Sequence, residues 1–300
     1  MASVIFITSR LDDNHGGLTS SMLNKARILY DEKNLSSIIL TFHADTNFNN
    51  VKSSILERYN LKGKVEIYNI NEYFKEKNLI SEKTKYKIDT SMYTSIKINE
   101  NKHEFYKDGL KKLEVFYSKN QIKEVKHFSE NNICTSKDVI DNDGYMYWQS
   151  YYLDNYLSRQ VFFKKDQTPF LTREFDAINK SDKITSLVLF EKKPLRFNSF
   201  DKFKEYFIDY HIKAPITYLV GEARGLDPVI MNIKNDYVRK IFMTHSIHIR
   251  PDTDIIRAGN RIVLENLNEI DALVLLTEKQ KKILKKDLDI EIITTSYHTQ

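Results

Sequence analysis

The sequence predicts an α/β protein whose parallel sheet is interrupted by an inserted antiparallel β region. Over the first 70 residues, apolar runs of strand length alternate with amphipathic helical patterns, which is typical of parallel strands joined by crossover helices. Short runs rich in aromatic and β-branched residues then replace this pattern, and the first pattern returns near residue 199. A chain of 300 residues has room for two domains. We expect residues 1–75 with 199–300 to form the parallel-sheet domain and residues 76–198 the antiparallel insertion.

The elements of the parallel-sheet domain are expected in alternating order. Buried apolar runs predict strands at residues 4–8, 37–42, 65–70, 216–220, 241–244, 272–276 and 290–294. Helical spacing of apolar residues predicts helices at residues 18–30, 48–59, 199–208 and 255–270, a short one from residue 227, and a last one after residue 277. Ser199 and Asp227 are the expected N-caps, Pro228 follows as N1, and Thr277 to Gln280 form a capping box.

Polar turn clusters divide the middle region into hairpins. Lys107-Asp108-Gly109 and Asp141-Asn142-Asp143-Gly144 are typical of tight turns between antiparallel strands. Aromatic residues gather from Tyr145 to Tyr152, where they suggest sugar stacking. On an antiparallel sheet, however, such a cluster is more often core or subunit interface.

Composition narrows the class of protein. A net charge of +5, from 46 basic and 41 acidic residues in mixed runs, is not a nucleic-acid-binding signature, so we expect no nucleic-acid partner. The single cysteine, Cys134, excludes an internal disulfide framework and favours a reducing compartment. No stretch approaches the roughly 18 apolar residues of a spanning helix. The sequence therefore predicts a cytoplasmic protein, at most peripheral to the inner membrane face.

A glycine pair, Gly16-Gly17, lies between the first expected strand and the first expected helix. Glycine lets the backbone approach a ligand closely, and the free N–H groups and dipole of a helix start favour a phosphate. The pair matches neither the GxGxxG fingerprint nor the Walker lysine pattern, so a plain strand-to-helix turn that needs positive φ also fits. Its position after the first strand of a doubly wound sheet favours the ligand, because ligands bind at the carboxyl ends of such strands.

Two further polar groups follow later strands and are expected at the same edge. His245 and His248 come directly after the strand at residues 241–244, where a histidine can contact a hydroxyl or phosphate, transfer a proton, or simply bond the backbone. No third ligand stands near them, so no metal site is expected. Glu222 and Arg224 follow the strand at residues 216–220 and are candidates for binding a polar acceptor.

The segment from Ser9 to Ala26, which contains the glycine pair, resembles the amino terminus of a known family. This family is the bacterial poly(glycerol-phosphate) and poly(ribitol-phosphate) α-glycosyltransferases that decorate wall teichoic acid. The segments His245 to His248 and Val274 to Gln280 look like the same family, as does a β insertion between the two halves of the domain. The insertion also resembles one found in glycosyltransferases that modify Ser-rich or Ser-Asp-repeat surface proteins.

The resemblance implies a retaining enzyme of the GT-B fold, in which two Rossmann-like domains face each other across a cleft that holds a UDP-sugar. The chain would be the amino-terminal, acceptor-side Rossmann-like domain, with Gly16 and Gly17 at the donor diphosphate and His248 or His245 near the anomeric centre. The implied reaction is hexosyl transfer from UDP-glucose or UDP-N-acetylglucosamine to teichoic acid polymer, with no cofactor besides the donor substrate. The insertion would form a homo-oligomer and engage the acceptor.

The resemblance also raises an expectation about activity. In the family a second Rossmann-like domain supplies the cations that grip the departing diphosphate, and no counterpart stands before Gln300. Most of the transition-state stabilisation comes from those cations. We therefore expect the chain alone to transfer sugar poorly or not at all, with a carboxyl-terminal donor domain in trans as a further partner.

Two alternatives stay open at this point. One is a non-enzymatic accessory module that oligomerises through the insertion and holds an acceptor. The other is a glycosyltransferase part that acts on Ser-rich surface proteins.

Overall fold

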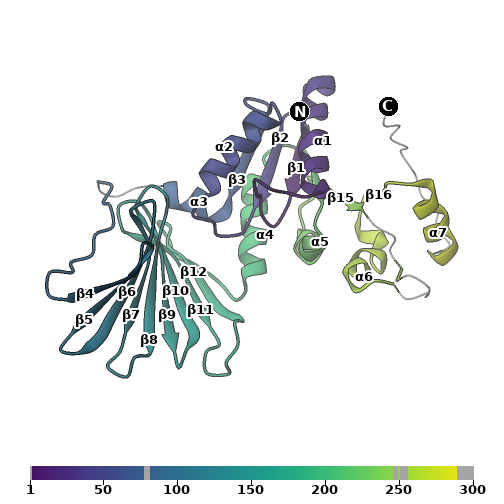
Figure 1. Ribbon diagram of the computed structural model, residues 1–300. Coiled ribbons are helices and arrows are strands. Elements are labelled where there is room, and N and C mark those ends of the chain that lie inside the picture. The colour runs from purple at the N-terminus through teal and green to yellow at the C-terminus, as the bar shows by residue number, and fades with distance from the viewer. Residues whose placement is uncertain (1, 78–81, 246–248, 251–255, 289–300) are drawn as a thin grey trace. The chain divides into compact units, whose positions relative to one another are not determined.

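The computed structural model describes residues 2–77, 82–245, 249–250 and 256–288, and it confirms an α/β protein with one parallel and one antiparallel sheet (Figure 1). The chain divides into two compact units. The described residues of 1–43, 48–70 and 204–300 form the parallel-sheet unit, and those of 44–47 and 71–203 form the antiparallel-sheet unit.

Six parallel strands build the first sheet, in the order β16-β15-β14-β1-β2-β3. Their bounds are β1 Ala2–Ile7, β2 Ser37–Thr41, β3 Val65–Asn69, β14 Ile216–Gly221, β15 Val238–Thr244 and β16 Ala272–Leu275. From β1 the chain moves outward to β3, and it later returns to pair β14 with the free side of β1. The order therefore reverses between β1 and β14, which is the switch point where ligands bind in doubly wound sheets.

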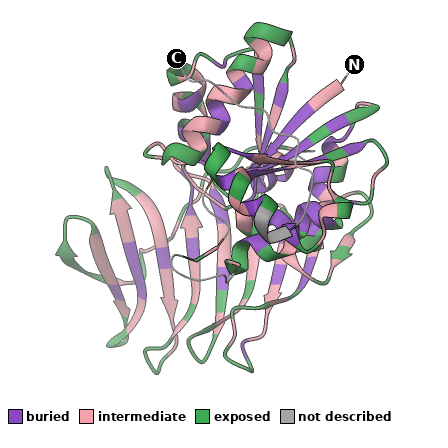
Figure 2. Ribbon diagram, turned by 90° about the vertical axis from the view of Figure 1, so that its right-hand side faces the viewer, coloured by how far each residue is buried: buried purple, intermediate pink, exposed green. Residues whose placement is uncertain are grey.

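Helices cover this sheet because their apolar faces pack on its buried strands. The helices of this unit are α1 Gly17–Lys33, α2 Phe48–Arg58, α5 Asp227–Asn232, α6 Ala258–Leu264 and α7 Glu278–Leu288, with 3₁₀ turns η1 Arg224–Leu226 and η2 Leu267–Glu269. Helix α4 Phe200–His211 lies mostly in this unit, and α3 Ile70–Glu76 belongs, from Asn71 on, to the antiparallel-sheet unit. Met22 and Ala26 of α1 and Ile55 of α2 join Val4 and Phe6 of β1 in one buried cluster. Figure 2 shows these parallel strands largely in the colour of buried residues. Within the described ranges, no helix has the length and apolar character that a membrane crossing requires.

Two of the helix starts predicted from sequence are confirmed. The backbone N–H of Lys202 donates to Ser199 Oγ at 3.2 Å, so Ser199 caps α4. In the capping box, the N–H of Gln280 donates to Thr277 Oγ1 at 3.1 Å, and Gln280 Oε1 accepts from the N–H of Thr277 at 3.0 Å. Both orphan donors at the start of α7 are thus satisfied.

Of three other expectations, two are wrong and one cannot be compared with the structure. Asp227 is not an N-cap: Leu226 occupies that position, and Asp227 is the first helical residue with its side chain turned into the interior, 0% exposed. The helix expected over residues 255–270 is shorter, because Asn266 leaves helical geometry (φ −129°) and its side chain bonds the carbonyl of Ile262. The strand expected at residues 290–294 lies outside the described residues.

The antiparallel sheet has ten strands, which pair in sequence order from β4 to β13 (Figure 1). They are β4 Thr94–Asn99, β5 Lys102–Lys107, β6 Leu110–Ser118, β7 Gln121–Phe128, β8 Cys134–Ile140, β9 Met146–Leu153, β10 Tyr156–Phe163, β11 Pro169–Phe175, β12 Ile184–Leu189 and β13 Leu195–Phe197. Asp108 and Gly109 both have positive φ (53° and 75°), as a two-residue type I′ hairpin turn requires. β4 ends the sheet and is exposed throughout, with Ile96 48% and Ile98 50% exposed.

A buried ion pair ties α3 to a hairpin turn inside the antiparallel-sheet unit. Lys75 is 2% exposed, and its Nζ lies 2.7 Å from Asp141 Oδ2 and 4.4 Å above the ring of Tyr147. Asp141 Oδ1 accepts from the backbone N–H groups of Asp143 (3.0 Å) and Tyr145 (2.9 Å). The aromatic cluster of the sequence thus supplies core, with Tyr147 fully buried, and surface, with Tyr151 38% exposed.

Candidate functional site

The glycine pair lies where β1 passes into α1. Gly16 is the N-cap of α1, with φ −80°, and Gly17 is the first helical residue, so the alternative of a turn that needs positive φ is wrong. Apart from its chain neighbours and its own helix backbone, no heavy atom of the described residues lies within 4 Å of a Cβ built on either glycine. Neither chain conformation nor packing therefore requires glycine here. Among the described residues, the N-cap makes no side-chain hydrogen bond to the helix start, and the first turn holds no acidic residue.

The loop before the glycine pair is anchored by His15. Its Nδ1 donates to the carbonyl of Asp12 at 2.7 Å, and its Nε2 lies 2.8 Å from Tyr59 Oη. Tyr59 Oη in turn lies 3.0 Å from Ser20 Oγ on the first turn of α1. The loop is thereby fixed from both sides, which leaves the glycines presented at a defined position.

Glu222, directly after β14, accepts hydrogen bonds from two side chains of other elements, Lys25 and His245. Its Oε1 accepts from Lys25 Nζ of α1 at 2.8 Å, and its Oε2 accepts from His245 Nε2 at 2.8 Å. Glu222 is 4% exposed. Burial alone would raise the pKa of this carboxyl, but the hydrogen bond from His245 and the charge of Lys25 outweigh burial, so the pKa lies below its ordinary value.

A second charged pair follows in η1 and α5. Arg224 Nε lies 3.4 Å from Asp227 Oδ2, yet among the described residues no donor makes a hydrogen bond to either carboxylate oxygen of Asp227. Burial raises the pKa of Asp227 to about 7, opposed only by the charge of Arg224. Burial also lowers the pKa of Arg224. This pair is close but poorly satisfied.

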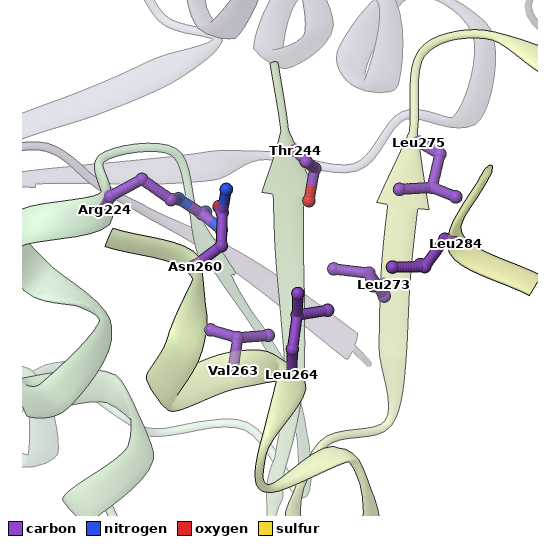
Figure 3. A pocket seen from close by; sticks show the side chains of 8 residues that line it. All are labelled: Arg224, Thr244, Asn260, Val263, Leu264, Leu273, Leu275 and Leu284. Atoms are coloured by element: carbon purple, nitrogen blue, oxygen red, sulfur yellow. The ribbon is translucent and has the colours of Figure 1, made fainter. Parts of the chain in front are cut away.

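A small pocket opens beside Arg224 (Figure 3). Its polar wall is made by Arg224, Thr244 at the end of β15 and Asn260 of α6, and Figure 3 shows the tips of Arg224 and Asn260 turned toward each other. The remaining wall is apolar and consists of Val263, Leu264, Leu273, Leu275 and Leu284. Its volume of about 10 Å³ accommodates about one water molecule, so a sugar nucleotide does not fit inside it.

The parallel pairing places these groups at one edge of the sheet. Ile7 pairs with Gly221 and Gly221 with Phe242, so β1, β14 and β15 end together, and we call this end the carboxyl edge. Gly16, Gly17, Glu222, Arg224 and His245 all follow these strand ends; His248 lies outside the described residues. The sequence did not single out Lys25 or Asn260. Lys25 stands 197 residues from Glu222, and only its place on a helix that starts at the glycine pair could have drawn attention to it.

The fold first defines a class: doubly wound α/β proteins whose parallel sheet is ordered 3-2-1-4-5-6. Comparison with known proteins then gives the relatives. No protein-family model matches the chain. The chain is 26% identical, over 306 residues, to a poly(ribitol-phosphate) alpha-N-acetylglucosaminyltransferase of Staphylococcus aureus (strain COL), an alignment that covers 98% of the chain.

Solved structures share the fold of the whole chain. A TarM mutant of S. aureus in complex with fondaparinux, alpha-GlcNAc-glycerol and UDP matches with a TM-score of 0.87 and 21% identity, over 100% of the chain and 62% of that structure. The pneumococcal O-GlcNAc transferase GtfA in complex with UDP and GlcNAc matches with a TM-score of 0.71 and 14% identity, over 98% of the chain and 60% of that structure. The relation to teichoic acid glycosyltransferases that the sequence predicts is confirmed. The chain spans 61% of the length of the curated relative.

Proposed function

We propose that this chain is the amino-terminal, acceptor-side part of a retaining, UDP-sugar-dependent glycosyltransferase of the GT-B fold. The implied reaction adds N-acetylglucosamine or glucose to poly(ribitol-phosphate) or poly(glycerol-phosphate) teichoic acid, with the UDP-sugar as donor substrate and no further cofactor. The relation to the S. aureus transferase, which extends over 98% of the chain, is the observation that carries the proposal.

The carboxyl edge supports this role physically. A helix start without a side-chain cap and with open space beside its two glycines suits a diphosphate, so Gly16 and Gly17 are assigned to the donor diphosphate. His245, held by Glu222 at the end of the neighbouring strands, is assigned to the reaction centre together with His248, and Arg224 to the acceptor. The side chains of His245 and Arg224 are polar and follow the carboxyl ends of β15 and β14, next to the switch point of the sheet.

The chain alone should transfer sugar poorly. The cations that stabilise a departing diphosphate contribute several kcal/mol to such a reaction, and a backbone loop supplies only part of this. The test joins residues 1–300 to the carboxyl-terminal part of the S. aureus relative and measures UDP release from UDP-N-acetylglucosamine and UDP-glucose with poly(ribitol-phosphate). We expect turnover by the chimera and little by the chain; appreciable turnover by the chain would refute the assignment.

Variants at Gly17 test the placement of the diphosphate. Gly17→Leu in the chimera should abolish UDP-sugar binding in calorimetry because its side chain fills the open space before the helix start, whereas Gly17→Ala should weaken binding less. The matched control is Gly63→Asn, at an exposed turn with φ 73° that asparagine tolerates, in the same unit but outside the carboxyl edge. Unchanged binding in Gly17→Leu would remove the glycine pair from the donor site.

A second candidate acceptor is a Ser-rich protein, which the fold shared with the O-GlcNAc transferase GtfA favours. The same chimera, offered a Ser-rich polypeptide in place of teichoic acid, separates the two acceptors. Transfer to the polypeptide alone would replace the teichoic acid assignment.

We also propose that the antiparallel sheet forms a homo-oligomer, supported by the exposed end strand β4 with its half-exposed Ile96 and Ile98. Light scattering should give a mass above that of one 35.5 kDa chain, and Ile96→Lys should lower it. A mass of one chain at high concentration would contradict this.

A further inference from the structure

We propose that Glu222 is a positioning residue that fixes the tautomer of His245, with the ring proton on Nε2, so that Nδ1 meets a ligand as a hydrogen-bond acceptor. Only the identity of that ligand, a sugar or polyol hydroxyl, rests on the proposed function. The tautomer itself follows from contacts inside the parallel-sheet unit.

The donor and acceptor roles leave one arrangement for the neutral ring. A carboxylate accepts hydrogen bonds and donates none, so Nε2, at 2.8 Å from Glu222 Oε2, must carry the proton. Nδ1 then holds a lone pair. No hydrogen bond joins Nδ1 to any other residue that the structure describes. A hydroxyl group can donate to this nitrogen, whereas an ionised phosphate oxygen cannot.

Lys25 prevents the carboxylate from turning away from the histidine. Its ammonium only donates, and it occupies Oε1 at 2.8 Å, so each carboxylate oxygen has one assigned partner. Lys25 lies two helical turns, roughly 12 Å, along α1 from Gly17. The cluster therefore connects the helix that begins at the glycine pair with the segment that follows β15.

Three groups from three elements face Glu222. The carboxylate faces Lys25 from α1, His245 after β15 and, at longer range, Arg224 from η1. Lys25 already balances the charge of Glu222.

Two other histidines provide internal references with the opposite tautomer. His15 Nδ1 lies 2.7 Å from the carbonyl of Asp12, and His211 Nδ1 lies 2.8 Å from the carbonyl of Phe207. Because a carbonyl only accepts, both rings carry the proton on Nδ1 when neutral. His245 should therefore differ from both in one spectrum.

The test is a long-range proton–nitrogen correlation spectrum of the ¹⁵N-histidine-labelled chain, recorded at about pH 8, where a histidine of ordinary pKa is neutral. In the wild-type chain we expect the Nε2–H pattern for His245 and the Nδ1–H pattern for His15 and His211. The wild-type spectrum alone can overturn the proposal: an Nδ1–H pattern for His245 is incompatible with it.

Variants then separate a positioning role from mere packing. In Glu222→Gln, Lys25 keeps the amide oxygen, the amide NH₂ faces His245, and Nε2 must accept, so the tautomer should reverse. Adding Lys25→Met frees the amide to turn its oxygen back to Nε2, so the double variant should restore the wild-type pattern. Unshifted His15 and His211 signals show that the fold is kept.

A His245 pattern unchanged by Glu222→Gln, or unrestored in the double variant, would overturn the role of Glu222. These spectra need no donor or acceptor sugar. Absence of glycosyl transfer in the chimera would refute the proposed function and leave this result standing.

Discussion

Two buried carboxylates, one in each unit, differ in their hydrogen bonding. Asp141 of the antiparallel-sheet unit accepts hydrogen bonds from two backbone N–H groups and from Lys75 at 2.7 Å. Asp227 of the parallel-sheet unit is 0% exposed and has only Arg224 at 3.4 Å, without a hydrogen bond to either oxygen among the described residues. The first carboxylate stabilises its surroundings, and the second costs free energy.

The two carboxylates differ in whether their oxygens have hydrogen-bond partners. An unsatisfied buried polar group costs about 1–3 kcal/mol, so it persists only where the rest of the fold offsets it. Asp227 and Arg224 lie next to the carboxyl edge, beside the pocket of Figure 3. In the antiparallel-sheet unit both oxygens of Asp141 accept hydrogen bonds, whereas in the parallel-sheet unit Asp227 stays incompletely paired next to the proposed site.

The largest loss of stability is expected from Lys75→Met, which removes the cation of the buried ion pair between Lys75 and Asp141. Asp141, and Glu72 at 3.8 Å, would lose a buried partner, and breaking such a pair costs about 3–5 kcal/mol. Urea unfolding followed by the fluorescence of Trp148, the single tryptophan, reports on this unit.

The matched control is Lys126→Met in the same sheet. Its Nζ lies 3.7 Å from Glu124 and its side chain is 34% exposed, so the loss should stay within about 1 kcal/mol. Equal losses of unfolding free energy in the two variants would show that the ion pair of Lys75 and Asp141 is no stronger than a surface pair.

A pH-dependent effect is expected from Asp227. Its folded-state pKa of about 7 lies above the unfolded value of about 3.9, so the folded chain holds a proton that the unfolded chain releases between these values. The free energy of unfolding should therefore fall as the pH rises from about 4 to 7, by up to about 4 kcal/mol, and then level off.

Asp227→Asn should remove this slope, so the variant gains stability relative to the wild type as the pH rises through the window. Urea midpoints at several pH values measure the gain. Asp31→Asn, which removes a carboxylate with a 44% exposed side chain, is the control and should keep the wild-type slope. A slope that survives in Asp227→Asn would mean that other groups cause it and that the pKa of Asp227 is not raised.

A smaller difference in stability is expected between alanine variants of two glycines near the carboxyl edge, Gly221 and Gly17. In Gly221→Ala the new Cβ would lie 2.9 Å from Ile230 Cδ1 and 3.1 Å from Phe242 Cδ1, so overpacking should cost about 1–3 kcal/mol. Gly17→Ala meets open space and should change the free energy of unfolding by less than about 0.5 kcal/mol. Thermal unfolding of both variants checks this; a comparable loss in Gly17→Ala would assign that glycine to the fold rather than to a ligand.

The smallest loss of stability is expected from a change at the start of α7. Gln280→Ala removes the acceptor for the N–H groups of Leu276 and Thr277 and should cost about 1 kcal/mol. Hydrogen exchange of the first turn of α7 should accelerate accordingly. Lys282→Ala, at an exposed position of the same helix, should leave exchange unchanged.

Local features of this fold could be predicted from sequence because their cause is local. The glycine pair between β1 and α1, the cap at Ser199 and the capping box at Gln280 each depend on residues within a few positions of one another. The same holds for the Asp108-Gly109 turn. Asp227 was misassigned for a related reason: Asp before Pro fits an N-cap pattern, but the side chain turns inward beside Arg224.

The polar contacts of the candidate site could not be predicted. Lys25 and Glu222 are separated by 197 residues, and Lys75 and Asp141 by 66, so neither pairing leaves a periodic or local pattern in the chain. Position at a strand end predicted that Glu222 and His245 would share an edge, but not that they would bond each other. That contact depends on the register of β14 and β15, which only the folded sheet defines.

The end strand β4 has a consequence for handling the protein. Within the part of the chain that the structure describes, no strand pairs with one side of β4. The strand contains no proline, and its exposed residues include Ile96 and Ile98. Such an end accepts any extended segment that offers matching N–H and C=O groups. At the high concentrations used for crystallisation, this strand rather than the carboxyl edge should set the solubility of the isolated chain.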